Sequence, residues 1–556
     1  MKYQTKSGNN YLYDCATGHI IRVDDTIYSI VDDWHILTDV EICEKYKKII
    51  DIERIKTALN ELQNLQKDNI LTDHAPCELS RVERVFYDRR EWNLGEFWQR
   101  TGMLLILGIT ERCNLCCSYC CFSGKFAGQR THSSRSMDWD VAKKAISDFL
   151  ENDQAGDGTC PITFYGGEPL LEFTLLKDCV CYAETLAKSL GKINRFAVTT
   201  NGTLLNDEMV DYLVEHQFLI LVSLDGPQKT HDRYRLFPNN QGSFDIISRN
   251  LKRFSERYPS YMNRGMNITL APPLDLDATA EFVNEIFPQY PFTRANLVNT
   301  GNEYRFNKDI ELSTQYGCYS QSICKKNLRD NGCLEGFRQF KSKDQEQMNK
   351  YWNICVESLA TLGVVKSWEI VPFAMMLFET QISFYHRRRV TDQVPEWAFF
   401  IPCVPGFTRR FLDVEGNYRI CERIDHSNTY ILGNVWSGLD RDKMERTMSL
   451  RRHFGDCGNC HALKVCDICY ARIPESDAME SGFDPFFDLQ CQRTRETTSL
   501  LLQTYTEIME RNKKAFERPP DGNLLQFKKL KYGSPSSRLG NEILEQLKLE
   551  TGTVDF

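Results

Sequence analysis

The sequence lacks features that would place the protein in a membrane, outside the cell or on nucleic acid. No apolar run approaches the roughly 20 residues of a membrane-spanning helix. The opening residues, MKYQTKSGNNYLYDC, carry no apolar core of a signal peptide. Basic residues are in deficit, with 68 Lys and Arg against 76 Asp and Glu and a net charge of −8, which argues against a nucleic-acid partner. We therefore expect a cytoplasmic protein that binds neither membranes nor nucleic acid.

Cysteine, by contrast, is abundant, with 22 among the 556 residues. In a small secreted domain so many cysteines would predict disulfides, whereas in a long intracellular chain they more often serve metal or redox chemistry. Many stand in tight groups, and sequence neighbours such as Cys116 and Cys117 are poor disulfide partners. The cysteine pattern therefore predicts metal centres.

From residue 103 onward, apolar strands alternate with helical stretches. Strands are expected at 103–110, 162–167, 195–202, 219–226 and 266–272, and helices at 138–151, 172–190, 206–216, 243–257 and, much later, 492–512. The alternation predicts parallel β/α units. Five or six such units fit an open or partial barrel, in which the loops after the strands build the site.

Three cysteines follow the first of these strands. Cys113, Cys117 and Cys120 have C-x3-C-x2-C spacing, and three thiolates on one loop can hold three irons of a 4Fe–4S cluster while the fourth iron stays open. This motif resembles the radical S-adenosylmethionine (radical SAM) superfamily. The resemblance implies an α/β fold, a partial (β/α)6 barrel of the radical SAM type. Cys116 and Cys121 do not fit the spacing and are interpreted as small buried packing residues.

Segments at the ends of later strands resemble the segments with which this family contacts S-adenosylmethionine. GGEP at 166–169 resembles the segment that holds the amino group, with glycines that let backbone approach the ligand. TTNG at 199–202 and SLDG at 223–226 resemble segments that meet the ribose and carboxylate. The alternatives are an ordinary strand-to-helix turn for GGEP and a surface salt bridge for Arg235. The predicted cofactor contacts are Gly166, Gly167, Glu168, Pro169, Thr200, Asn201, Ser223 and Arg235.

The resemblance also implies the chemistry. S-adenosylmethionine chelates the open iron, and one electron, from a donor such as flavodoxin or ferredoxin, splits it into methionine and a 5′-deoxyadenosyl radical. That radical abstracts a hydrogen atom from the substrate, while the protein positions the cofactor and excludes water. The sequence assigns no residue a catalytic role of its own.

A second cysteine-dense region lies near the C-terminus. Cys403, Gly416 and Cys421 form a C-x12-G-x4-C pattern, and C-x2-C-x5-C-x2-C follows at 457–469, with Cys491 last. This resembles the SPASM extension, which binds auxiliary iron–sulfur clusters, although the family usually ends its central group C-x3-C. By position, one auxiliary cluster, expected as 4Fe–4S, would be held by Cys457, Cys460, Cys466 and Cys491, and the other by Cys403, Cys421 and Cys469.

The second auxiliary cluster has no evident fourth ligand. Either a distant cysteine such as Cys355 or Cys324 completes it, or one iron stays open and binds a substrate cysteine thiolate. A zinc ribbon is the alternative for the whole region, because paired C-x2-C groups suit tetrahedral zinc.

The N-terminal residues predict a small winged-helix-like module. Residues 11–31 are expected as short strands, 51–65 as an amphipathic helix and 69–71 as a closing strand. The module resembles the leader-peptide recognition element of enzymes that modify ribosomally made peptides, which takes the leader as an added β-strand. A generic winged helix or a stabilising cap is the alternative. Binding to DNA is disfavoured because the segment has no basic recognition helix.

These resemblances imply a radical SAM/SPASM peptide maturase that joins a cysteine sulfur to a peptide carbon as a thioether. The alternatives are an anaerobic sulfatase-maturing, formylglycine-generating enzyme, a carbon–carbon crosslinking enzyme, or a zinc-stabilised peptide-binding protein. The expected organisation is a leader-recognition module at 1–80, a linker at 81–102, the radical SAM barrel at 103–300, a variable bridging segment at 301–400, the SPASM domain at 401–495, and a helix and tail at 496–556.

Overall fold

The structure is a computed structural model of the chain. It describes residues 1–71, 104–120, 122–123, 131–152, 158–286, 288–297, 342–387, 390, 405–406, 409–422, 430–440, 442–444, 447, 460–462, 465–466 and 485–518. The predicted linker at 81–102 and Cys324 lie outside the described residues. Within the described ranges, no helix combines the length and apolar character needed to span a bilayer.

A small module at the N-terminus joins a three-stranded antiparallel sheet to three helices. Its elements are β1 (Lys2–Gln4), β2 (Asn10–Tyr13), β3 (Ile20–Val23), α1 (Asp25–Trp34), α2 (Asp39–Tyr46) and α3 (Ile52–Lys67). The strand order is β1-β2-β3. Apolar residues on one face of each helix pack with Leu12 into a hydrophobic cluster of their own, as their spacing predicts.

Two expectations for this module are wrong in detail. Residues 25–31, expected within the stranded stretch, lie in α1, because the Asp24 side chain caps the helix by accepting from the Ile27 N–H at 2.8 Å. Residues 69–71 form a turn rather than a closing strand, with positive φ at Asn69 (61°) and Leu71 (57°). The helix expected at 51–65 is confirmed as α3.

A ten-stranded sheet runs through the rest of the chain, in the order β13-β12-β11-β10-β4-β5-β6-β7-β8-β9. Its first six strands in sequence are β4 (Leu105–Thr110), β5 (Thr159–Gly166), β6 (Ile193–Thr200), β7 (Leu219–Ser223), β8 (Arg264–Leu270) and β9 (Arg294–Leu297). They pair in parallel, each with the next in the chain. The sheet has two ends and does not close into a barrel. This agrees with the prediction of a partial barrel.

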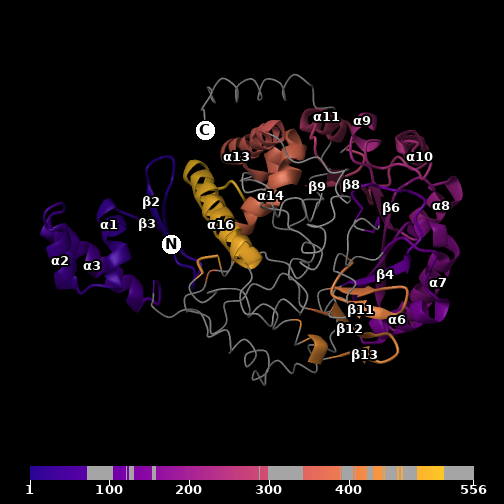
Figure 1. The fold of residues 1–556 in the computed structure, drawn as a ribbon, viewed down its shortest axis with the longest axis horizontal. Helices are drawn as coiled ribbons and strands as arrows, with labels where there is room; N and C mark the ends of the chain where they lie inside the picture. The colour runs from indigo at the N-terminus through magenta and orange to yellow at the C-terminus, as the bar shows by residue number, and fades with distance from the viewer. Residues whose placement is uncertain are drawn as a thin grey trace.

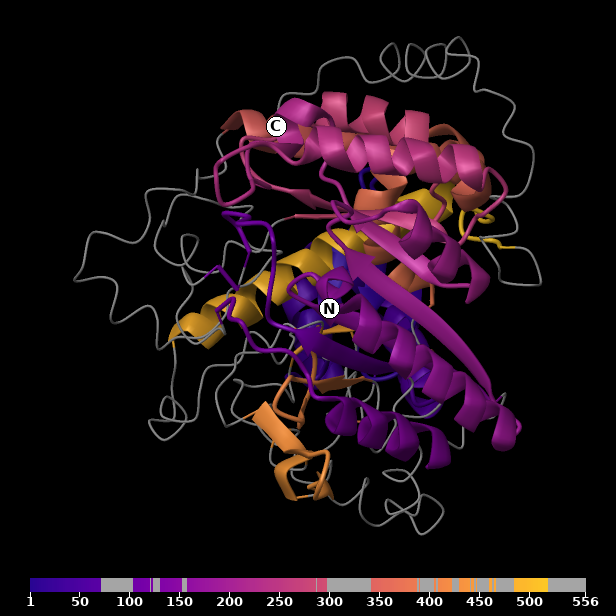
Figure 2. The ribbon, with the colours of Figure 1, turned by 90° about the vertical axis from the view of Figure 1, so that its right-hand side faces the viewer.

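Helices connect these parallel strands. They are α6 (Trp139–Glu151), α7 (Phe173–Ser189), α8 (Asp207–Glu215), α9 (Gln228–His231), α10 (Phe244–Arg257) and α11 (Leu276–Ile286). The expected helices at 138–151, 172–190, 206–216 and 243–257 are confirmed to within a few residues. Figures 1 and 2 show these helices along the outer side of the sheet. The carboxyl ends of the strands therefore carry the loops in which the predicted site lies.

The C-terminal region adds strands to the same sheet. These are β10 (Arg410–Leu412), β11 (Asn417–Arg419), β12 (Ile431–Asn434) and β13 (Gly438–Leu439). β10 pairs in parallel with β4, with Phe411 opposite Ile106, and β11 to β13 continue antiparallel. The region expected as a separate domain thus shares one sheet with the parallel strands β4 to β9.

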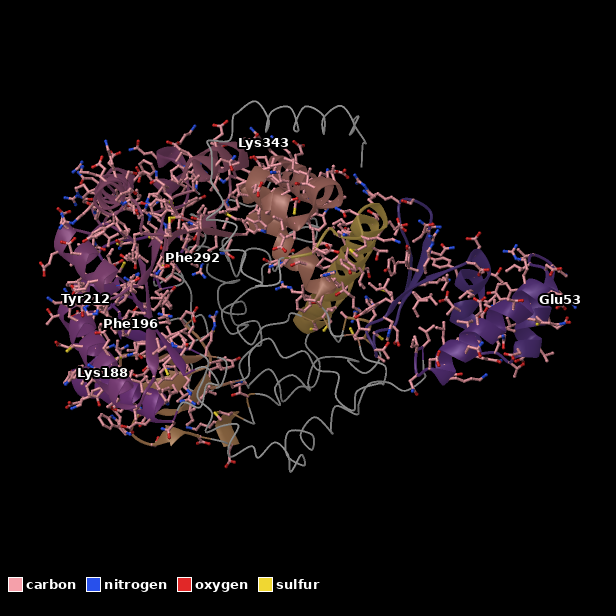
Figure 3. All side chains as sticks on the ribbon, turned by 180° about the vertical axis from the view of Figure 1, so that it is seen from behind. Glu53, Lys188, Phe196, Tyr212, Phe292 and Lys343 are labelled. Carbon is pink, nitrogen blue, oxygen red and sulfur yellow. The ribbon has the colours of Figure 1, made fainter. Side chains whose placement is uncertain are left out.

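Three long helices lie between the sheet and the N-terminal module: α13 (Ser342–Ile370), α14 (Pro372–His386) and α16 (Pro485–Arg511) (Figure 1). α16 confirms the helix expected at 492–512. Figure 3 shows how far apart the two ends of the molecule lie, with Glu53 of α3 at one end and Lys188 and Tyr212 at the other.

The module docks on α16 through the hairpin of β1 and β2. The Glu510 carboxylate accepts hydrogen bonds from Thr5 Oγ1 (3.1 Å), Asn9 Nδ2 (2.8 Å) and Tyr11 Oη (2.9 Å). One turn earlier on α16, Thr506 Oγ1 lies 2.7 Å from the hydroxyl of Tyr3. These contacts cover the β1 side of the small sheet.

Candidate functional site

The loop after β4 is fixed to the rest of the domain by its backbone. All six residues of β4 are buried. Beyond it, the Cys116 N–H donates to Leu236 O at 2.7 Å and the Ser118 N–H donates to Tyr234 O at 3.0 Å. The loop at 113–120 is therefore paired with the segment that follows β7, although more than 100 residues separate them in sequence.

The three cysteines of the predicted cluster lie together on this loop. Cys117 is buried, while Cys113 and Cys120 are half-buried against the same small apolar cluster. Burial raises the pKa of the Cys113 and Cys117 thiols to about 12, and the charges of all three sulfurs interact. Such thiols are protonated at neutral pH unless a metal displaces the proton.

This donor set fits an iron–sulfur cluster better than a single ion. Across the described ranges, no three His, Cys, Asp or Glu side chains are arranged to hold one metal ion. A 4Fe–4S cluster takes each thiolate on a different iron, so the three sulfurs need not converge on one point. Cys113, Cys117 and Cys120 are the residues predicted to hold such a cluster, which would supply an electron for the cleavage of S-adenosylmethionine.

Cys116 is exposed, which corrects its interpretation as a buried packing residue, and Cys121 lies outside the described residues. We expect Cys116→Ala to leave the cluster intact and Cys117→Ala to remove it, because Cys116 is exposed whereas Cys117 is buried beside Cys113 and Cys120. The measurement is the change that S-adenosylmethionine causes in the electron paramagnetic resonance (EPR) spectrum of the reduced protein. Equal loss of that change in both variants would contradict the assignment.

Residues 132–135, which follow the cysteine loop in the chain, hold Glu111, which lies just before that loop. Arg135 binds the buried Glu111 carboxylate through Nε at 2.9 Å and a terminal nitrogen at 3.0 Å, a bidentate geometry that fixes both planes. Ser133 Oγ also donates to Glu111, at 2.6 Å. Directly before Ser133 in the chain, His132 brings Nε2 to 3.9 Å from the sulfur of Cys120.

The glycines of GGEP touch the end of β4 and the residue just before the cysteine loop. Gly166 has φ of +146°, and a β-carbon there would lie 2.2 Å from Thr110 O. At Gly167 a β-carbon would lie 2.0 Å from Arg112 O. The N–H groups of Gly167 and Glu168 donate to these same carbonyls, at 2.8 and 2.7 Å. The absent side chains thus permit close backbone packing of two loops, while the contact with a ligand stays a prediction.

Glu168 joins the ends of β5 and β6. It is fully buried, and its two oxygens accept from Thr200 Oγ1 (2.7 Å), the Asn201 N–H (2.6 Å) and the Leu170 N–H (3.1 Å). Burial raises its pKa to about 7, against the opposing effect of these donors. Pro169, directly after it, is buried as well. Glu168 and Thr200 are therefore hydrogen-bonded to each other within the protein, and their contact with the cofactor stays a prediction.

Asn201 belongs to a closed ring of hydrogen bonds. Its Nδ2 donates to Asn114 Oδ1 at 2.7 Å, Asn114 Nδ2 donates to Thr203 Oγ1 at 2.8 Å, and Thr203 Oγ1 donates back to Asn201 Oδ1 at 2.7 Å. Since Asn114 is the residue after Cys113, the ring ties the cluster loop to the end of β6.

Ser223 and Arg235 lie near the end of β7. Ser223 is buried, and its hydroxyl makes no hydrogen bond to any described residue, which leaves it available to a ligand. Arg235 is buried too, so the alternative of a surface salt bridge is wrong: its Nε donates to Asp225 Oδ2 at 2.9 Å in the interior.

Asp225 is a residue of the site that the sequence prediction missed. It is 1% exposed and accepts from Arg235, from the Tyr119 hydroxyl of the cluster loop and from the Thr269 N–H of β8 at 2.9 Å. The only signal in the sequence is its place in SLDG, two residues after Ser223.

The auxiliary cysteines are only partly described. Cys421 follows β11, and Cys460, Cys466 and Cys491 are half-buried. Cys403, Cys457 and Cys469 lie outside the described residues.

The glycine of the C-x12-G-x4-C pattern is explained by a tight turn. Gly416, with φ of +81°, forms the turn between β10 and β11, and a β-carbon there would lie 2.9 Å from Val435 Cγ1. The turn brings Cys421 to the end of β11. Cys355, considered as a distant fourth ligand, is fully buried in α13 with its sulfur 3.8 Å from Met375 Sδ, which is the environment of a packing residue.

Comparison with known proteins identifies the class of this domain. Residues 107–286 match the radical SAM superfamily. A cysteine-type anaerobic sulfatase-maturating enzyme of Clostridium novyi is 30% identical over 155 residues, which are 27% of this chain and 39% of that protein. The radical SAM cyclopropyl synthase TigE of Paramaledivibacter caminithermalis is 24% identical over 263 residues, 44% of this chain and 51% of that protein. The chain thus spans about two fifths to one half of these relatives.

A solved structure of native anSMEcpe with bound AdoMet shares the fold, with a TM-score of 0.50 and 16% identity over 73% of this chain and 99% of that chain. The open parallel sheet and the cysteine loop after β4 lie in the part of the chain, residues 107–286, that is similar to the radical SAM superfamily. For this part of the chain the superfamily implies a 4Fe–4S cluster and S-adenosylmethionine.

Proposed function

We propose that the protein modifies a ribosomally synthesised precursor peptide, forming thioether links between cysteine sulfur and carbon. The observation that carries the proposal is the N-terminal module, a sheet with one covered side and one open edge. Its β1 side is docked on α16, whereas β3 pairs with β2 alone among the described strands. An open edge is where a peptide adds as a further strand.

The hydrogen-bonding pattern between β1, β2 and β3 shows which backbone N–H and C=O groups of β3 point away from β2. The N–H of Tyr13 donates to Met1 O and that of Thr5 to Asn9 O, so odd-numbered residues of β2 bond to β1. Residues 10 and 12 therefore bond to β3, opposite Val23 and Ile21. The N–H and C=O of Arg22, between those two, face the open edge and are free to pair with a leader strand.

Forming one thioether removes two hydrogens from the peptide. One leaves the carbon as a hydrogen atom and ends in 5′-deoxyadenosine. The other leaves the cysteine thiol as a proton, and an auxiliary cluster held by the C-terminal cysteines would take up the remaining electron. The C-terminal cysteines support this role, because β10 and β11 hold Cys421 on the same sheet as the cluster loop. The electron that starts each turnover comes from a donor such as flavodoxin or ferredoxin.

Sulfatase maturation, the oxidation of a Cys or Ser to formylglycine, is a second candidate function. It is favoured by the names of relatives, including the sulfatase-maturating enzyme of Clostridium novyi. The open edge of β3 favours the peptide maturase, since a client that enters the barrel directly needs no such edge. Carbon–carbon crosslinking and a zinc-stabilised binding protein remain as outcomes of the tests.

The test of the proposal is the intact mass of a cysteine-rich precursor peptide encoded beside the gene, co-expressed without air. A loss of about two mass units per link, with one alkylatable thiol lost for each, supports thioether formation. The same mass loss with all thiols free indicates a carbon–carbon link. Formylglycine on a sulfatase client with an unchanged peptide supports the second candidate. Zinc without labile sulfide in the anaerobically purified protein would overturn both.

The open edge makes its own prediction. Arg22→Pro removes the outward N–H without touching the ladder to β2, and proline is tolerated on edge strands. We expect about tenfold weaker binding of the leader, the effect of losing roughly 1.4 kcal/mol. Arg22→Ala, the matched control, removes only the exposed side chain and should bind more tightly than the proline variant. Equal affinities of the two variants in a fluorescence anisotropy titration would place the leader elsewhere.

A further inference from the structure

Arg235 points its remaining donors at the cluster loop. Its Nε is bound to Asp225, and its terminal nitrogen Nη1 lies 3.9 Å from the sulfur of Cys117. The guanidinium also lies over the ring of Tyr119, with its central carbon 5.3 Å from the ring centroid. A planar cation fixed on two sides in this way has one orientation, and that orientation aims an N–H at a cluster ligand.

The surroundings of this contact are largely shielded from water. Arg235 is 8% exposed and Asp225 is 1% exposed, so little water screens the charge. The Asp225 carboxylate is itself held by the Thr269 N–H and the Tyr119 hydroxyl. Arginine stays protonated under all relevant conditions, so the positive charge beside Cys117 is permanent.

We infer that Arg235 is a positioning residue for the radical SAM cluster: it donates a hydrogen bond to the Cys117 sulfur and raises the cluster's reduction potential. Reduction adds negative charge to a cluster and its thiolates. A fixed cation bonded to one sulfur therefore stabilises the reduced form more than the oxidised form. The consequence is a cluster that is easier for an electron donor to reduce. This role is separate from the contact with S-adenosylmethionine predicted for Arg235 and does not depend on the substrate.

The test is a redox titration of the reconstituted protein without S-adenosylmethionine or peptide, followed by EPR. The signal of this cluster is recognised in a parallel sample as the one that changes when S-adenosylmethionine is added. Arg235→Lys keeps a cation for Asp225 but is too compact to bond both partners. We expect its reduction equilibrium constant to fall about tenfold, which is about 59 mV for one electron.

Two further variants make the result specific. Tyr119→Phe removes a hydrogen bond to Asp225 in the same loop but leaves Arg235 beside Cys117, so its potential should equal that of the unmodified protein. Arg235→Gln keeps a donor for Asp225, removes the charge, and should lower the potential at least as much as the lysine variant does. An unchanged potential in both Arg235 variants, or an equal shift in Tyr119→Phe, would overturn the inference. An effect that appears only after S-adenosylmethionine is added would also overturn it, in favour of a cofactor contact alone.

Discussion

Alanine in place of Gly167 is expected to abolish assembly of the cluster at the loop after β4. The added β-carbon would lie 2.0 Å from Arg112 O and 2.6 Å from its carbonyl carbon. These are backbone atoms of the residue directly before Cys113, so no side-chain movement relieves the clash. The two loops must separate, which breaks the hydrogen bonds from Gly167 and Glu168 to the cluster loop and displaces the first cysteine.

A matched control separates this clash from the general cost of replacing a glycine. Gly191, at the end of α7, has φ of +66° and no heavy atom within 4 Å of an added β-carbon. Gly191→Ala should lose about 1–2 kcal/mol of folding stability from its left-handed backbone and keep its cluster. Iron and sulfide per chain, together with the EPR signal that responds to S-adenosylmethionine, measure the difference. A Gly167→Ala protein with that signal intact would show that the close contact of the two loops is dispensable.

The parallel β/α units could be predicted from the sequence because their signal is local. Each strand is an apolar run and each helix an amphipathic one, and the observed bounds differ from the expected ones by only a few residues. The pairing of β10 with β4 could not be predicted in this way, because residues 410–412 and 105–107 are some 300 residues apart. Nothing in a three-residue strand identifies such a distant partner.

In the site, too, some residues could be predicted from the sequence and others only from the fold. Three cysteines with fixed spacing are rare enough to be recognised, whereas Asp225 is one of 76 acidic residues. Its importance comes from partners at 119, 235 and 269, which only the fold brings together. The GGEP glycines show a related limit: their packing against Thr110 and Arg112 was not predicted, and their contact with the cofactor stays a prediction. Their small size indicates a close approach, but the sequence does not say which atoms approach.

Asp225→Asn is expected to destabilise the domain of parallel β/α units severely, because it leaves the Arg235 cation buried without its partner. Removing one member of a buried ion pair costs about 3–5 kcal/mol. The same change also weakens the bonds to Tyr119 and Thr269 that connect the cluster loop to β8. For a domain of this size we expect a fall in Tm of roughly 2–4 °C for each kcal/mol, measured by circular dichroism of the anaerobic protein.

The chain contains a matched control on its surface. Asp211 binds Arg257 through two hydrogen bonds, at 2.5 and 2.6 Å, and accepts from the Tyr258 hydroxyl at 2.7 Å, so it repeats the Asp–Arg–Tyr arrangement in contact with solvent. Asp211→Asn should change Tm little, because water screens an exposed pair and solvates the partner left behind.

If so, Asp225→Asn lowers the stability because Arg235 is left buried without a partner, and not simply because an ion pair is lost. A double variant tests this directly. Arg235→Met removes the stranded cation, so the Asp225→Asn/Arg235→Met protein should be more stable than Asp225→Asn alone, with a coupling of about 1–3 kcal/mol between the two sites. Additive losses in the double variant would mean that the two residues act independently. The triad of Asp225, Arg235 and Tyr119 would then not be the unit that holds the cluster loop against β8.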